Sequence, residues 1–153
     1  MPGRDPYVAV VGSGEGSVQE LEAAEEIGAG LATLGAVVVT GGLGGVMEAA
    51  SRGAKSRRGR TLGLLPGADR TAANGWVDIA VATGLGELRN GLVVRAADAV
   101  VAVGGGPGTL SEIALALKAG LPVVGVGTWD VHGVDHVTTA GEAIHRIESV
   151  LRD

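Results

Sequence analysis

The chain has no cysteine and few aromatic residues: its 153 residues include no Phe, one Tyr and two Trp. Without cysteine, disulfides and thiolate metal sites are excluded. The shortage of aromatic rings leaves few platforms on which nucleic-acid bases could stack. The formal net charge of −5 is also the wrong sign for contact with a phosphate backbone. We therefore expect no nucleic-acid partner.

Long apolar runs are missing as well. Although 46% of the residues are hydrophobic, no run is long enough to span a bilayer. The first residues do not form the basic, hydrophobic leader typical of secretion. We therefore expect no membrane partner and a cytoplasmic protein. The length suits one domain with a substantial core, so residues 1–153 are expected to form a single Rossmann-like nucleotide-binding domain.

Glycine is abundant, at 28 residues. Short apolar runs, typical of strands buried on both faces, alternate with helical patterns, and glycines lie at the joints. This alternation predicts an α/β fold, with a doubly wound, mainly parallel Rossmann-like sheet of about six strands and helices on both faces. The expected strands are residues 7–11, 36–40, 61–65, 77–81, 99–103 and 121–126, and the expected helices are residues 18–34, 46–55, 87–97, 110–119 and 140–151.

Three glycine clusters each follow an expected strand and precede an expected helix: residues 12–16, 41–45 and 104–108. Ligands of such folds bind beyond the carboxyl ends of the strands, so the clusters should converge on one crevice. The predicted ligand-binding residues are Gly12, Ser13, Gly41, Gly42, Gly45, Gly104, Gly105, Gly106, Gly108 and Thr109.

The third cluster is the most typical of a ligand site. A glycine-rich turn from strand to helix directs free N–H groups and the positive end of the helix dipole at one point, which favours a phosphate. An alternative interpretation is a capping box, with Thr109 as N-cap and Glu112 three residues later. Residues 17–20 and 139–142 have the same spacing. They lack the preceding glycines, however, and this difference favours a bound anion at the third cluster.

The glycine clusters do not match the common nucleotide-binding motifs. A dinucleotide fingerprint that begins at Gly12 requires glycine at position 17, which is Ser17, and the second strand ends in Thr40 without the expected acid. No glycine loop is followed by the G-K-S/T of NTP hydrolases. His132 and His136 lie four residues apart, but in a glycine-containing loop. We predict no metal there and expect this loop to lie over the crevice.

Arg89 and the segment 105–112, Gly-Gly-Pro-Gly-Thr-Leu-Ser-Glu, resemble the P-G-G-x-G-T-x-x-E signature of the LOG family, also called lysine decarboxylase-like. Residues 41–47 and 12–13 are similar to its other glycine motifs. The resemblance implies a homodimer or homotetramer. It also implies hydrolysis of a nucleoside 5′-monophosphate to base and ribose 5-phosphate, with no cofactor required. By this resemblance Gly105, Gly106, Gly108 and Thr109 hold the phosphate, and Arg89 and Glu112 form the catalytic pair.

The chain departs from this pattern at three places. Gly104 replaces the first proline, Asn90 replaces the lysine after the arginine, and residues 86–88 replace a Met-His pair. These changes resemble a branch that includes molybdenum-cofactor carrier proteins, which hold a phosphorylated pterin without chemistry. A hydrolase and a carrier with the molybdenum cofactor as cargo therefore both fit, and a nucleotide-sensing module is a third alternative. Decarboxylation is not expected, because neither Lys55 nor Lys118 is placed to bind a pyridoxal cofactor.

Overall fold

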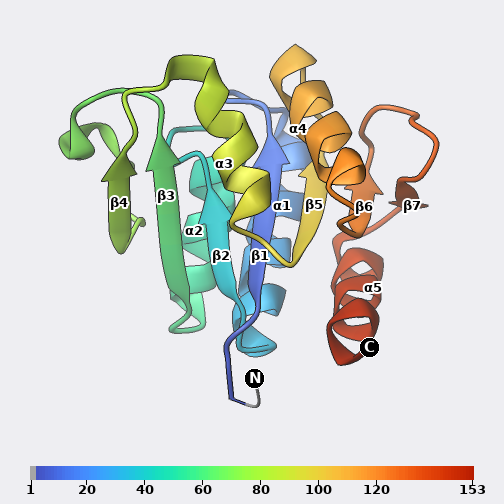
Figure 1. The fold of residues 1–153 in the computed structure, drawn as a ribbon. Helices are drawn as coiled ribbons and strands as arrows, with labels where there is room; N and C mark the ends of the chain where they lie inside the picture. Colours follow the sequence, from blue (N-terminus) through green and yellow to red (C-terminus); the bar gives the residue numbers. More distant parts are fainter. Residues whose placement is uncertain (1–2) are drawn as a thin grey trace.

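The computed structural model describes residues 3–153, which form a seven-stranded sheet with helices on both faces (Figure 1). The strand order is β4-β3-β2-β1-β5-β6-β7, and every neighbouring pair is parallel. The elements are β1 (Tyr7–Gly12), α1 (Val18–Thr33), β2 (Val37–Thr40), α2 (Val46–Ser56), β3 (Arg60–Leu65), η1 (Arg70–Ala72), β4 (Ile79–Ala82), η2 (Gly86–Leu88), α3 (Arg89–Arg95), β5 (Ala99–Val103), α4 (Pro107–Lys118), β6 (Val123–Val126), β7 (Asp135–Val137) and α5 (Ala140–Arg152).

The central strands are short valine-rich runs because both of their faces are buried. Alternate residues of β1 enter two separate cores. Val8 and Val10 pack with α1, α2 and α5 on one face, whereas Ala9 and Val11 pack with α3 and α4 on the other. This two-sided burial confirms the predicted α/β architecture. None of the helices formed by residues 3–153 is long and apolar enough to cross a membrane.

Helices α1 and α2 pack at backbone contact, and glycine makes this possible. A Cβ placed on Gly28 would lie 2.0 Å from the carbonyl oxygen of Ala50, and one on Gly53 would lie 1.9 Å from that of Glu25. The close packing also joins the loops that precede the two helices, because the Val46 N–H donates to the Ser13 carbonyl at 3.0 Å. Two of the three glycine clusters therefore lie side by side at the carboxyl edge.

The structure corrects several predicted boundaries. The fourth strand begins at Ile79, two residues late. At Asp78 the backbone N–H is shared between the Thr61 carbonyl and hydroxyl, and the Thr61 N–H donates to the Asp78 carboxylate, so side chains complete the pairing there. The expected helix over 87–97 is a 3₁₀ turn, η2, followed by the shorter α3, which ends at Arg95. Finally, β7 lies inside an expected loop, where its three residues are too few for a periodic pattern.

Candidate functional site

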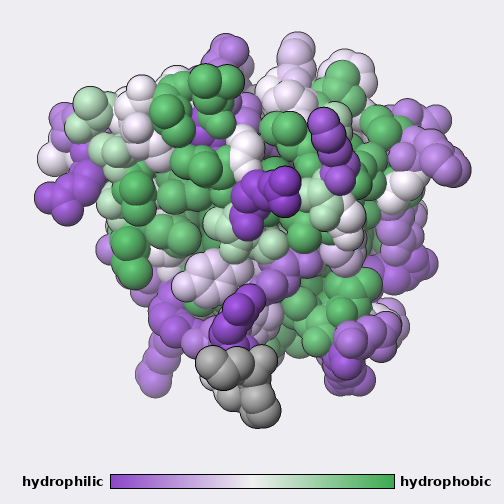
Figure 2. Space-filling model, viewed as in Figure 1, coloured by the Kyte–Doolittle hydropathy of each residue, from purple (hydrophilic) through white to green (hydrophobic). Residues whose placement is uncertain are grey.

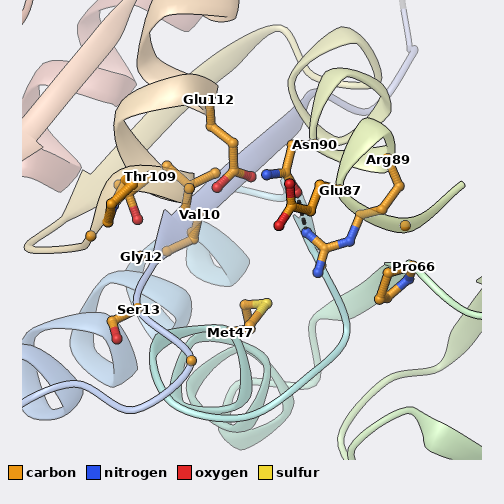
Figure 3. A pocket seen from close by; sticks show the side chains of 17 residues that line it. Val10, Gly12, Ser13, Met47, Pro66, Glu87, Arg89, Asn90, Thr109 and Glu112 are labelled. Carbon is orange, nitrogen blue, oxygen red and sulfur yellow. Dashed lines mark hydrogen bonds between the residues drawn. The ribbon is translucent and has the colours of Figure 1, made fainter.

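A cavity of about 420 Å³ opens at the carboxyl edge of the sheet, below the start of α4 (Figure 3). Its walls come from the end of β1 and its loop, the end of β2, the first turn of α2, the η2–α3 segment and the first turns of α4. This volume is in the range of small-molecule sites. We refer to it as the α4 cavity. The three predicted glycine clusters all contribute to it, as expected for a doubly wound fold.

Helix α4 begins three residues earlier than predicted. Gly106 is its N-cap and Pro107 is its first residue, a position that the fixed φ of proline favours. Thr109 is therefore inside the first turn and Glu112 inside the second, so the capping-box interpretation of these two residues is wrong. No side-chain cap closes this helix end, which leaves the first N–H groups without intrahelical acceptors. By contrast, Ser17 and Thr139 cap α1 and α5 as expected.

The glycines at the start of α4 divide into two kinds. Gly104 and Gly105 have φ of +53° and +106°, and a Cβ on them would collide with Glu20 and Thr109. The turn itself therefore requires these two glycines. Gly106 has an ordinary φ of −101°, and a Cβ there would meet nothing within 4 Å. At Gly108 a Cβ would meet only the Asn90 side chain, at 3.9 Å. The space that side chains at positions 106 and 108 would occupy is thus open for a ligand.

The other predicted binding residues divide in a similar way. Gly12, Ser13 and Gly41 line the α4 cavity together with Gly106, Gly108, Thr109, Arg89 and Glu112. Gly42 and Gly45, like Gly104 and Gly105, do not line it. Gly42 has a φ of +78° and packs against Leu65, while Gly45 has a φ of +64° and packs against the Ser13 carbonyl. These four glycines shape the loops around the cavity.

Arg89, the first residue of α3, extends a buried guanidinium into the cavity (Figure 3). It is only 9% exposed, and its pKa is lowered by burial and raised by the charge of Glu112. One terminal nitrogen donates to Asn90 Oδ1 at 2.6 Å, but Nε has no hydrogen-bond partner within residues 3–153. Among the described residues, no carboxylate lies within 4.0 Å of it. A buried cation without an ion pair is unusual, because its burial destabilises the folded protein.

Glu112 reaches the same cavity from α4 (Figure 3). It is 6% exposed, and burial raises its pKa to about 7, against the opposing effect of the Arg89 cation. The two side chains thus influence each other through space but do not form a salt bridge. The structure places the predicted catalytic pair in one cavity, on two different helices, without direct contact.

Several lining residues escaped the sequence analysis as site residues. Some of them reach the cavity only because η2 and α3 fold over the edge of the sheet, and no local pattern signals this. Asn90 and Glu87 stood out in the sequence only as departures from the family signature. The additional lining residues are Val10, Val11, Gly14, Met47, Pro66, Gly86, Glu87, Asn90 and Pro107.

The loop between β6 and β7 packs beside the glycine turn. Trp129 Nε1 donates to the Gly106 carbonyl at 3.1 Å, and the Thr128 hydroxyl donates to the Gly104 carbonyl at 2.7 Å. Trp129 does not line the α4 cavity, so this loop braces the turn from outside. His136 lies 3.8 Å from Asp130. Within residues 3–153 no three His, Asp or Glu side chains cluster as metal ligands would.

Comparison with known proteins places this geometry in a family. Residues 5–151 match the SLOG cluster4 family (LDcluster4). A protein of Archaeoglobus fulgidus, described as uncharacterized, is 44% identical over 113 residues, 74% of each chain. The molybdenum cofactor binding protein of Rippkaea orientalis superimposes with a TM-score of 0.92 at 38% identity, over 97% of this chain and 99% of that one. The molybdenum cofactor carrier protein of Chlamydomonas reinhardtii superimposes with a TM-score of 0.91 at 37% identity, over 98% of this chain and 100% of that one. The chain therefore belongs to the SLOG cluster4 family, in agreement with the LOG-like signature of its sequence.

Proposed function

We propose that this protein binds the phosphorylated pterin of the molybdenum cofactor in the α4 cavity and carries it without chemical conversion. One observation carries the proposal: an uncapped helix N-terminus and a buried arginine with an unpartnered Nε face the same cavity. Both features stabilise an anion. The similarity to proteins named for binding or carrying this cofactor supports the choice of ligand.

The phosphate would bind where α4 begins. Free N–H groups of the first turn are directed there, and the lack of a Cβ at Gly106 and Gly108 keeps the approach open. Thr109, which is 3% exposed, adds a hydroxyl at the same helix end. The rest of the ligand would lie along Gly12, Ser13 and Gly41. In this role Gly104 and Gly105 hold the turn in shape.

A phosphoribohydrolase is the second candidate, because Arg89 and Glu112 face one cavity. Hydrolysis of the N-glycosidic bond builds positive charge on the ribose, which an ionised carboxylate would stabilise. Burial raises the pKa of Glu112 to about 7, which works against the ionised form that this role requires. No hydrogen bond among residues 3–153 orients its oxygens. These features favour carriage over hydrolysis.

The two functions predict different products with AMP. We expect the parent protein to bind the phosphorylated pterin in calorimetric titrations and to release no adenine from AMP, as measured by chromatography. Gly108→Val should weaken pterin binding about tenfold or more, because its side chain would fill the approach to the helix end. Gly141→Val is the matched control, since Gly141 is also the second residue of a helix, α5, and is remote from the cavity.

Adenine release by the parent protein, abolished in Glu112→Gln, would replace the carrier proposal with the hydrolase. Equal pterin affinity in Gly108→Val and the parent would instead show that the anion binds elsewhere.

We further propose that the protein is a homodimer or homotetramer, assembled through an apolar surface on the α3 side. Figure 2 shows hydrophobic residues gathered over α3 and the neighbouring sheet edge. They include Leu88, which is 78% exposed, and also Ile79, Val81, Leu85, Leu92 and Leu115. Contiguous exposed apolar residues of this kind mark interfaces between proteins.

Light scattering is expected to give a multiple of the 15.1 kDa chain mass. Leu88→Asp combined with Leu92→Asp should shift the mass towards that of one chain, because charges would be buried at the interface. Val18→Asp is the control, since Val18 is 72% exposed on α1, outside this surface. A single-chain mass for the parent at every concentration would rule out the oligomer.

A further inference from the structure

Glu112 is only 6% exposed, and its carboxyl group reaches the α4 cavity without gaining a protein partner. No hydrogen bond or salt bridge among residues 3–153 involves its carboxyl group. Asp78 shows the contrast: although partial burial raises its pKa, hydrogen bonds from Lys55 and Thr61 lower that pKa overall. The chain thus supplies donors to a carboxylate that it keeps ionised. It supplies none to Glu112, and a buried carboxyl group without donors favours its neutral form.

Few charged groups face Glu112. Of the cations in residues 3–153, only Arg89 on α3 lines the α4 cavity, and it lies more than 4.0 Å away. Glu87 on η2 is exposed at the same cavity and adds negative charge. The lining residues of β1 and α2, such as Val11 and Met47, do not titrate. Nothing in this surrounding holds Glu112 firmly as an anion.

A phosphate at the start of α4 would shift this balance further. Thr109 and Glu112 are three residues apart and therefore lie on the same face of the helix. An anion bound beside Thr109 is thus close to the Glu112 carboxyl group, and like charges raise the pKa of a carboxyl group. That pKa is already about 7 in the free protein. A protonated carboxyl group also has an O–H donor, which an ionised one lacks.

We propose that Glu112 binds the ligand as a neutral carboxylic acid that donates a hydrogen bond to an oxygen of the bound anion, so that binding takes up a proton from solvent. The inference rests on the proposed function, because it requires an anionic ligand in the α4 cavity. It assigns Glu112 a role in ligand recognition that differs from that of an ionised catalytic carboxylate. It also predicts that the protein releases its ligand more readily as the pH rises.

Calorimetric titration of the full chain with inorganic sulfate and with ribose 5-phosphate tests the inference. Sulfate stays fully ionised across the range, so it contributes no protons of its own. We expect the affinity of the parent protein for sulfate to fall about tenfold from pH 6 to pH 8, as Glu112 ionises. The heat of binding near pH 7 should depend on the ionisation enthalpy of the buffer, which reports proton uptake.

Glu112→Gln supplies a permanent N–H donor of similar shape. We expect its affinity for sulfate to equal that of the parent at pH 6 and to stay constant up to pH 8. The parent and the variant contain the same exposed histidines, none of which lines the cavity. A difference between their pH profiles therefore reports Glu112 and not the histidines. Glu142→Gln, at the start of α5, is the control and should keep the parental pH profile.

Thermal unfolding checks the fold of the variant. The folded-state pKa of Glu112 is raised, so its contribution to stability is lost as the pH rises through about 7. Glu112→Gln should therefore be at least as stable as the parent at pH 8. Parental pH dependence in the variant, or weaker sulfate binding than the parent at pH 6, would overturn the inference. If neither sulfate nor ribose 5-phosphate binds at any pH, the proposed function itself fails.

Discussion

Arg89→Met is expected to weaken the binding of AMP or a phosphorylated pterin about a hundredfold. Among residues 3–153 the Arg89 guanidinium is the one cation lining the α4 cavity, and its Nε has no partner there. A charge-assisted hydrogen bond to a buried guanidinium contributes about 1.5–3 kcal/mol, and about 2.7 kcal/mol corresponds to a hundredfold change in Kd. Methionine keeps the apolar stem but removes the charge and every donor. Calorimetric titration measures the loss directly.

The same substitution should leave the free protein as stable as the parent or more so. Arg89 is buried without an ion pair, so its charge is a cost that the ligand offsets. Arg95→Met is the matched control, because Arg95 is on the same helix but exposed and outside the cavity. If Arg89→Met lowered the melting temperature and left the affinity unchanged, Arg89 would be a structural residue that supports α3.

Gly53→Ala is expected to destabilise the folded protein by about 3 kcal/mol, the upper range for overpacking. Its Cβ would lie 1.9 Å from the Glu25 carbonyl oxygen on α1, and backbone atoms cannot rotate away as a side chain can. Helices α1 and α2 would have to move apart, and the contact between Ser13 and Val46 at the cavity would move with them. Urea unfolding measures the stability, and calorimetric titration with AMP shows whether the site is weakened too.

Gly91→Ala is the control for this substitution. Gly91 is also inside a helix, α3, but a Cβ there would lie 4.0 Å from the Leu115 side chain, an ordinary contact. Alanine should therefore stabilise α3 by about 0.5–1 kcal/mol, the usual gain over glycine in a helix. If Gly53→Ala and Gly91→Ala changed the free energy of unfolding equally, α1 and α2 could move apart without loss of stability.

Local sequence patterns were sufficient to predict most of the fold. Valine-rich runs indicated β1, β2 and β5, because a strand buried on both faces needs apolar residues throughout. Glycine clusters after three strands indicated where a ligand site would form, since parallel strands end at one edge. The caps of α1 and α5 followed from Ser17 and Thr139, because capping bonds join residues only three positions apart.

The sequence by itself therefore determined the α/β architecture, the family and the edge of the sheet that holds the cavity. Tertiary structure alone decided which glycines serve the turn and which leave open space, because that depends on distant neighbours such as Glu20 and Asn90. It also decided that Arg89 and Glu112 share a cavity without forming a salt bridge. Burial raises the pKa of Glu112 and lowers that of Arg89, and this burial arises only when α3 and α4 pack over the sheet.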